Sequence, residues 1–164
     1  LDTDTIKKIL LKTTHACKLL LEKLNVAFFD LKSLNIMIKK VSNNNKIKYE
    51  SYLIDFSKNY MISDWTEFKS FSIGLTNFDE DYFWAPEVNK LRFNLENIEQ
   101  FERLDKRLII WRQWANKAMV YQIAKTFEFY NSIFNYNEVI NSIVPNMLAM
   151  KSNERPTLED VMKG

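Results

Sequence analysis

The chain has 164 residues, which is enough for one domain with a sizeable hydrophobic core. Hydrophobic residues make up 46% and charged residues 27%, so a packed core is expected rather than disorder. Lysine and arginine total 23 against 21 acidic residues, a balance that gives no nucleic-acid or membrane-surface signature.

The residue types that are rare in this chain exclude several kinds of functional site. One cysteine, Cys17, excludes an intramolecular disulfide framework, and one histidine, His15, argues against a histidine-built metal centre. With only two glycines, Gly74 and Gly164, the chain contains no glycine-rich phosphate loop. No apolar run approaches the roughly 18 residues of a membrane span. Because the sequence starts at Leu1 without a methionine, we expect it to be a piece of a longer protein.

The first predicted element is an amphipathic helix over Thr5–Leu24. Its apolar residues recur at three- and four-residue spacings, and Asp2, Thr3 or Asp4 is the candidate N-cap. His15 falls beside the apolar stripe, so we expect it at the surface, and Cys17 falls within it, so we expect it in the core.

A small hairpin is expected next. Val26–Leu34 is too polar at its centre for a core strand, whereas Asn35–Ile38 has the pattern of a short strand. Ser42–Asn45 has the composition of a turn, and Tyr49–Asp55 is predicted to be the second strand.

The rest of the chain is predicted to be a long loop followed by helices. Phe56–Asp81 holds no period, and ordered loops of that length usually carry function. Asn94–Phe129 and Glu138–Met150 have helical patterns, and Leu158–Met162 follows a capping signal at Thr157. The expected fold is therefore mainly α with a small β-hairpin, in one domain spanning residues 1–164.

Four short motifs occur in a fixed order along this framework. They are Asp30-Leu31-Lys32-Ser33-Leu34-Asn35, then Asp55-Phe56-Ser57, Ala85-Pro86-Glu87 and Asn153-Glu154-Arg155-Pro156-Thr157. Each alone is weak, but the first follows an amphipathic helix and the second closes the predicted hairpin. Together they resemble the C-terminal lobe of a eukaryotic protein kinase, over essentially the whole chain. The lysine two residues after the aspartate is typical of serine/threonine kinases.

The resemblance implies a phosphoryl-transfer site that uses ATP and magnesium. Asp30 would orient the substrate hydroxyl, and Lys32 would contact the transferred phosphate. Asn35 and Asp55 would hold Mg²⁺ through hard oxygen ligands, and Asn35 and Asp55 with Lys32 would form the nucleotide site. The resemblance also implies a structural ion pair, between Glu87 and Arg155, beneath the activation segment.

The sequence also departs from the family pattern. The family's N-terminal lobe, with its glycine-rich loop and strand lysine, is absent from this chain. The catalytic loop opens with Phe28-Phe29 in place of His-Arg, and Phe29 removes the usual receiver of a loop phosphate. Ser57 replaces a glycine, and Glu80 replaces a threonine beside the site. Arg112 falls where the central helix, which contains Trp114, usually has an anchoring aspartate.

Three functions therefore stay open. The first is a serine/threonine kinase that transfers the ATP γ-phosphate to a protein hydroxyl. The second is a pseudokinase that keeps the fold as a binding or structural module in a larger assembly, and the third is a kinase-like enzyme for a small molecule or lipid. Expected partners are a protein substrate or binding partner and the missing lobe or another subunit, with no nucleic acid and no membrane span. The expected location is intracellular, in the cytoplasm.

Overall fold

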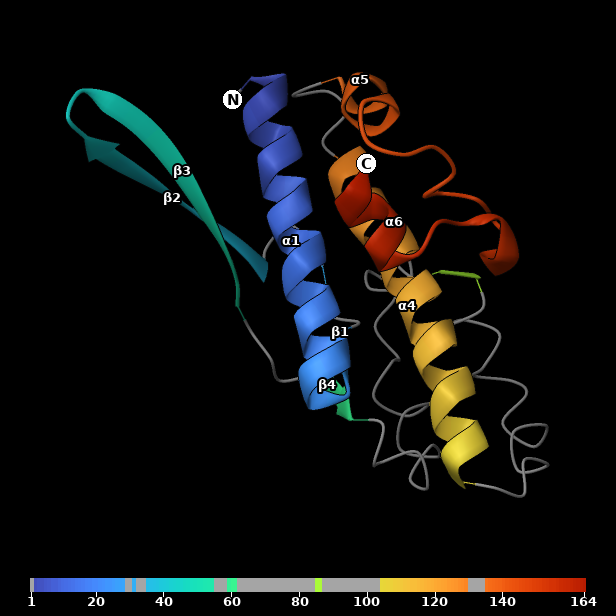
Figure 1. Cartoon of the computed structure of the whole chain (residues 1–164). Helices are drawn as coiled ribbons and strands as arrows, with labels where there is room; N and C mark the ends of the chain where they lie inside the picture. Colours follow the sequence, from blue (N-terminus) through green and yellow to red (C-terminus); the bar gives the residue numbers. More distant parts are fainter. Residues whose placement is uncertain are drawn as a thin grey trace.

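The structure is a computed structural model that describes residues 2–28, 31, 35–54, 59–61, 85–86, 104–129 and 135–164. These parts of the chain are mostly helical, with two small antiparallel sheets, which agrees with the expected mainly α class (Figure 1). The elements are α1 (Thr3–Leu24), β1 (Val26–Phe28), β2 (Ile36–Asn43), β3 (Lys46–Leu53), β4 (Asn59–Met61), α4 (Leu104–Glu128), α5 (Tyr136–Asn141), the 3-10 helix η4 (Ser152–Glu154) and α6 (Leu158–Lys163).

Helix α1 confirms the first prediction. Asp2 is the cap, because its carboxylate accepts a hydrogen bond of 2.7 Å from the Thr5 amide. The helix ends where Asn25 adopts a left-handed conformation with φ of 53°. Cys17 is fully buried in the apolar stripe and His15 is exposed, both as expected.

The core lies between α1, α4 and α6, which pack side by side (Figure 1). Helix α4 contributes an almost continuous buried run from position 115 to position 124, and Leu158 and Val161 of α6 are fully buried. Trp114 is half-buried and packs against this core. The helical prediction for Asn94–Phe129 is confirmed from Leu104 onward, and residues 87–103 lie outside the described part.

The first small sheet corrects two predictions. Residues 26–28 form a strand whose three residues are all buried, although Val26–Leu34 was expected to be too polar for one. The polar residues of that segment lie after the strand, so the average over nine positions concealed a three-residue apolar stretch. Its antiparallel partner β4 lies within the predicted loop Phe56–Asp81, where Ala27 pairs with Tyr60. The other residues of that segment lie outside the described ranges.

The second sheet is the predicted hairpin, in a longer form. Strands β2 and β3 pair from Ile36 with Leu53 to Asn43 with Lys46. The turn is therefore only Asn44-Asn45, rather than the four residues of Ser42–Asn45. Both asparagines have positive φ, 47° and 63°, the backbone that a two-residue hairpin turn requires and that asparagine tolerates.

The C-terminal region confirms one helix and shortens another. The expected helix over Glu138–Met150 is wrong beyond Asn141, where α5 ends. Pro145 has no amide hydrogen to donate, and Asn146 is left-handed with φ of 67°, so the segment forms turns. Helix α6 appears as predicted after Thr157, which forms a reciprocal capping box with Asp160. No helix in the described ranges is both long and apolar enough to cross a membrane.

Candidate functional site

The segment between β1 and β2 contains the first predicted motif, and helix α4 forms a hydrogen bond to it at Leu31. Leu31 is buried, with 1% of its surface exposed, and its carbonyl accepts a hydrogen bond of 3.0 Å from Gln122 Nε2. Thr126 Oγ1 lies 3.4 Å from the same carbonyl and 2.7 Å from the carbonyl of Gln122. Its single proton therefore goes mainly to Gln122, and Gln122 is the main anchor of Leu31.

Asn35 is the member of the predicted magnesium site that the structure describes. It lies directly before β2 and is 4% exposed. Its backbone carbonyl accepts a hydrogen bond of 2.9 Å from the Ile54 amide, which closes the base of the hairpin. The base therefore joins Asn35 to the residue that precedes Asp55 in the sequence. Asp55 itself, with Asp30 and Lys32, lies outside the described residues.

Arg155, predicted to form the structural ion pair, is buried with 2% of its surface exposed. Its guanidinium donates to the backbone carbonyls of Ala149 at 2.8 Å, Lys117 at 2.7 Å and Met150 at 3.5 Å. It also lies 5.3 Å above the ring of Tyr121. Burying a cation is costly, and these donor bonds and the ring offset that cost. The expected partner Glu87 falls outside the described residues, while Ala85 of the same motif is fully buried.

The neighbouring residues of α4 clamp the start of α6. Lys117 Nζ donates to the carbonyl of Arg155, so these two residues each donate to the other's backbone. Asn116 Oδ1 accepts a hydrogen bond of 2.8 Å from the Leu158 amide, and its Nδ2 donates to Glu159 at 3.2 Å. Residues 155–159, at the start of α6, are therefore held to α4 by three hydrogen bonds from Lys117 and Asn116.

Arg112 and Phe28 occupy positions where the family pattern differs. Arg112 is exposed, and its guanidinium donates to Asn25 Oδ1 at the end of α1. It therefore ties α4 to α1, and the carbonyl contact to Leu31 comes from Gln122, 10 positions further along. Phe28, in place of the family's histidine, is fully buried.

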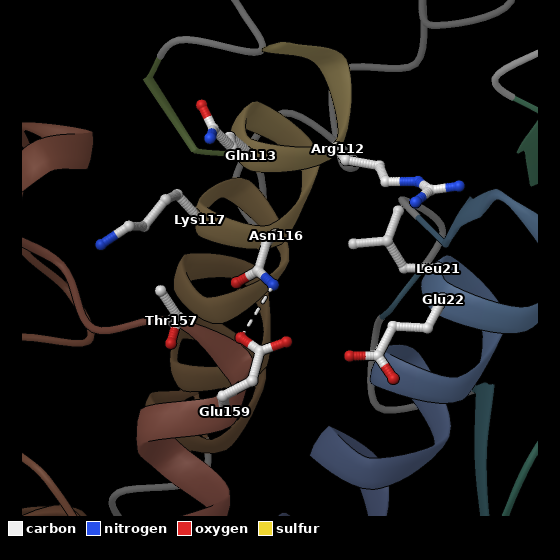
Figure 2. A pocket seen from close by; sticks show the side chains of 8 residues that line it. All are labelled: Leu21, Glu22, Arg112, Gln113, Asn116, Lys117, Thr157 and Glu159. Carbon is white, nitrogen blue, oxygen red and sulfur yellow. Dashed lines mark hydrogen bonds between the residues drawn. The ribbon is translucent and has the colours of Figure 1, made fainter. Parts of the chain in front are cut away.

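A pocket of about 560 Å³ lies between α1, α4 and α6. Figure 2 shows Glu22 and Glu159 directed toward one another, with Asn116 bonded to Glu159. Burial alone would raise the pKa of Glu159, but hydrogen bonds from its own amide and from Asn116 outweigh it and hold the pKa below its usual range. Arg112 and Lys117 also line the pocket. This mixed charge favours neither anionic nor cationic ligands.

Cys17 and the described acidic residues add no second chemical centre. Burial raises the pKa of the Cys17 thiol to about 12, so the thiol stays protonated and is not a nucleophile at neutral pH. Within the described part of the chain, no three histidine, cysteine, aspartate or glutamate side chains gather where they could hold a metal ion.

Comparison of the chain with protein-family models, with curated proteins and with solved structures gave no match. The site is therefore defined by its own residues. Gln122, Thr126 and Asn116 were missed by sequence reasoning, although a signal existed. They are polar residues within the apolar run of α4, and a buried polar side chain must find a hydrogen-bond partner.

Proposed function

We propose that this chain is the large lobe of a protein serine/threonine kinase, which transfers the γ-phosphate of ATP to a protein hydroxyl. The observation that carries the proposal is the closed hairpin base, where Asn35 is buried and bonded to Ile54. This bond joins the end of the Asp30–Asn35 motif to Ile54, the residue that precedes the Asp55–Ser57 motif in the sequence. Such proximity is what a shared nucleotide and metal site requires of the two motifs.

Asn35 and Asp55 suit magnesium chemically. An amide oxygen and a carboxylate are hard ligands, and Asn35 stands at a rigid hairpin base rather than in a long loop. When bound, the ion would neutralise charge on the phosphates. Asp30 would accept the hydrogen bond of the substrate hydroxyl and orient it, and Lys32 would donate to the phosphate.

The anchoring of Leu31 supports this assignment. Leu31 lies between Asp30 and Lys32, and its carbonyl is held by Gln122 from α4. A fixed backbone at that point limits the positions that the two neighbouring side chains can reach. Phosphoryl transfer depends mainly on positioning, so a helix that fixes this loop serves the proposed reaction.

A pseudokinase is the second candidate, favoured by specific observations. Arg112, at the position of the family's anchoring aspartate, donates to Asn25 at the end of α1. Helix α5 ends at Asn141, so the expected helix over 138–150 is mostly turns. Both features differ from what an active kinase lobe leads one to expect, while Asp30, Lys32, Asn35 and Asp55 are all retained in the sequence.

Thermal melting with ATP, with and without magnesium, separates the two candidates. The longest natural form of the protein should be used, and a kinase should melt several degrees higher only when both are present. Asp55→Asn should abolish the magnesium-dependent shift. Asp30→Asn should keep the shift but lower phosphate transfer to a peptide library at least about 100-fold.

The exposed Glu138→Gln on α5 is the matched control, and it should change neither readout. A protein that shows no shift at millimolar ATP and transfers no phosphate is the pseudokinase. Transfer to small hydroxyl compounds but to no peptide would instead indicate the small-molecule enzyme.

A further inference from the structure

The turn end of the β2–β3 hairpin extends away from the helices (Figure 1). The hairpin also exposes large apolar side chains. Met37 is 53% exposed, Ile38 44%, Ile47 56% and Tyr52 48%. These are four of the eight large apolar residues that are exposed in the described part of the chain, although the hairpin is only a small fraction of it. Concentrated apolar exposure of this kind marks an interaction surface.

The same hairpin is strongly basic, in contrast to the nearly balanced chain. It carries four exposed lysines and one glutamate: Lys39, Lys40, Lys46, Lys48 and Glu50. The glutamate already has partners within the hairpin, because Glu50 accepts a hydrogen bond of 2.6 Å from the Tyr52 hydroxyl and its carboxylate lies 3.9 Å from Lys48 Nζ. The charge that the hairpin offers to a partner is therefore positive.

The outer edge of β2 offers backbone groups as well. The Ile54 amide bonds to the Asn35 carbonyl, and antiparallel partners alternate in bonding, so odd-numbered residues of β2 face β3. The amides and carbonyls of Ile38, Lys40 and Ser42 therefore point outward. No strand in the described ranges pairs with this edge of β2, whereas β3 packs against α1.

We propose that the outer edge of β2 binds an extended acidic segment of a partner protein, which adds a third strand to the hairpin. The backbone edge would supply the main-chain hydrogen bonds of strand addition. Alternate side chains of the added strand would lie beside Met37 and Lys39 on one face and beside Ile38 and Lys40 on the other. The best ligand therefore carries apolar residues near positions 37–38 and acidic residues near 39–40.

Charge complementarity selects the acidic segment, and the apolar residues select a polypeptide over nucleic acid. A nucleic-acid surface would pair its lysines with several stacking aromatic rings. Here the apolar neighbours of the lysines are aliphatic, such as Ile38, Val41 and Ile47. The two aromatic residues of the hairpin, Tyr49 and Tyr52, both lie in β3, away from the outer edge of β2. This surface lies outside the proposed nucleotide site and does not depend on catalytic activity.

A random dodecapeptide display library, selected against the purified chain, tests the proposal. Enriched peptides should alternate acidic and apolar residues, and the best one should bind in fluorescence anisotropy with an affinity that falls as salt rises. The Lys39→Glu, Lys40→Glu double variant should weaken that peptide at least tenfold. Lys23→Glu, an exposed lysine near the end of α1, is the charge-matched control and should leave binding unchanged within twofold.

Backbone pairing has its own arm. Two versions of the selected peptide are compared, one N-methylated at its even-numbered amides and the other at its odd-numbered amides. One version should lose binding and the other should keep it, because only alternate amides of an added strand face β2. Unchanged circular dichroism and melting of the double variant verify its fold. The proposal is overturned if the enriched peptides show no acidic bias, if the double variant binds the peptide equally well, or if neither N-methylated peptide loses binding. It is also overturned if a single-stranded oligonucleotide or anionic vesicles bind more tightly than the peptide.

Discussion

The helical body of α1, α4 and α6 buries several polar side chains in its core, whereas the β2–β3 hairpin exposes both charged and apolar ones. In the body, Arg155 and Gln122 are each 2% exposed, and both donate to backbone carbonyls. On the hairpin, Ile47 is 56% exposed and its neighbour Lys48 reaches solvent. The contrast indicates that the body determines stability and that the hairpin is available for partners, so substitutions in the two regions should differ sharply.

The largest effect is expected at Arg155. Arg155→Ala removes the donor of three backbone carbonyls and leaves a cavity above Tyr121. We expect the free energy of unfolding to fall by about 3–5 kcal/mol, measured by urea denaturation. Arg155→Lys should recover only part of this, because an ammonium cannot span the same carbonyls. Lys151→Ala, at an exposed pair with Glu154, should change stability by less than about 0.5 kcal/mol. An equally small effect at Arg155 would contradict its role.

Gln122 comes next. Gln122→Leu keeps the buried volume similar but removes the 3.0 Å bond to the Leu31 carbonyl. The free energy of unfolding should fall by about 1–3 kcal/mol, the cost of leaving a buried carbonyl without its main donor. Gln113→Leu on the exposed face of the same helix is the matched control and should be nearly neutral. Equal effects of the two variants would show that the carbonyl has another donor.

The cap of α6 should matter less. Thr157→Ala removes the hydroxyl that accepts from the Asp160 amide at 3.1 Å. A loss of about 1 kcal/mol is expected from denaturant unfolding, because one N-terminal amide loses its partner. Thr157→Ser retains the hydroxyl and should restore most of the stability; a serine variant as unstable as the alanine variant would exclude capping as the cause.

Acid should remove the contribution of Asp160. Hydrogen bonds from the Thr157 amide and hydroxyl hold the pKa of Asp160 below its ordinary value of 3.8. A carboxyl whose pKa is lower in the folded state stabilises above the unfolded pKa, and this contribution disappears as pH falls through the folded value. Asp160→Ala should therefore cost about 0.5 kcal/mol at pH 6. The melting difference from the natural protein should shrink below pH 3.8, and a constant difference would rule out the carboxylate charge as its source.

Local signals in the sequence predicted the elements that depend on local chemistry. The stripe of α1, the cap at Thr157 and the existence of the hairpin follow from neighbouring residues alone. The failures have the opposite origin. Strand β1 depends on pairing with β4, more than 30 positions away, and the Leu31 anchor depends on Gln122 from another helix. Pro145 was a local signal that the helical pattern around it concealed.

The structure describes only some residues of the four kinase-like motifs. Asn35 and Arg155 are both buried, and Asn35 lies at the hairpin base that leads to Asp55. The roles of Asp30, Lys32, Asp55 and Glu87 stay predictions. Sequence order suggested which residues belong together, but only the fold shows that Gln122 of α4 holds the backbone carbonyl of Leu31. Every residue has a backbone carbonyl, so the amino-acid type at position 31 gives no sign that its carbonyl accepts a hydrogen bond.

The smallest effect is expected on the hairpin, and it is the sharpest test of the contrast. Ile47→Thr should change the free energy of unfolding by less than about 0.5 kcal/mol, because Ile47 is 56% exposed and threonine suits a strand. Ile123→Thr makes the same replacement at a fully buried position of α4 and should cost at least about 2 kcal/mol. Denaturant unfolding of both variants in parallel measures the difference directly. If Ile47→Thr costs as much as Ile123→Thr, another part of the protein covers the hairpin in solution, and its apolar side chains are core rather than a surface open to a partner.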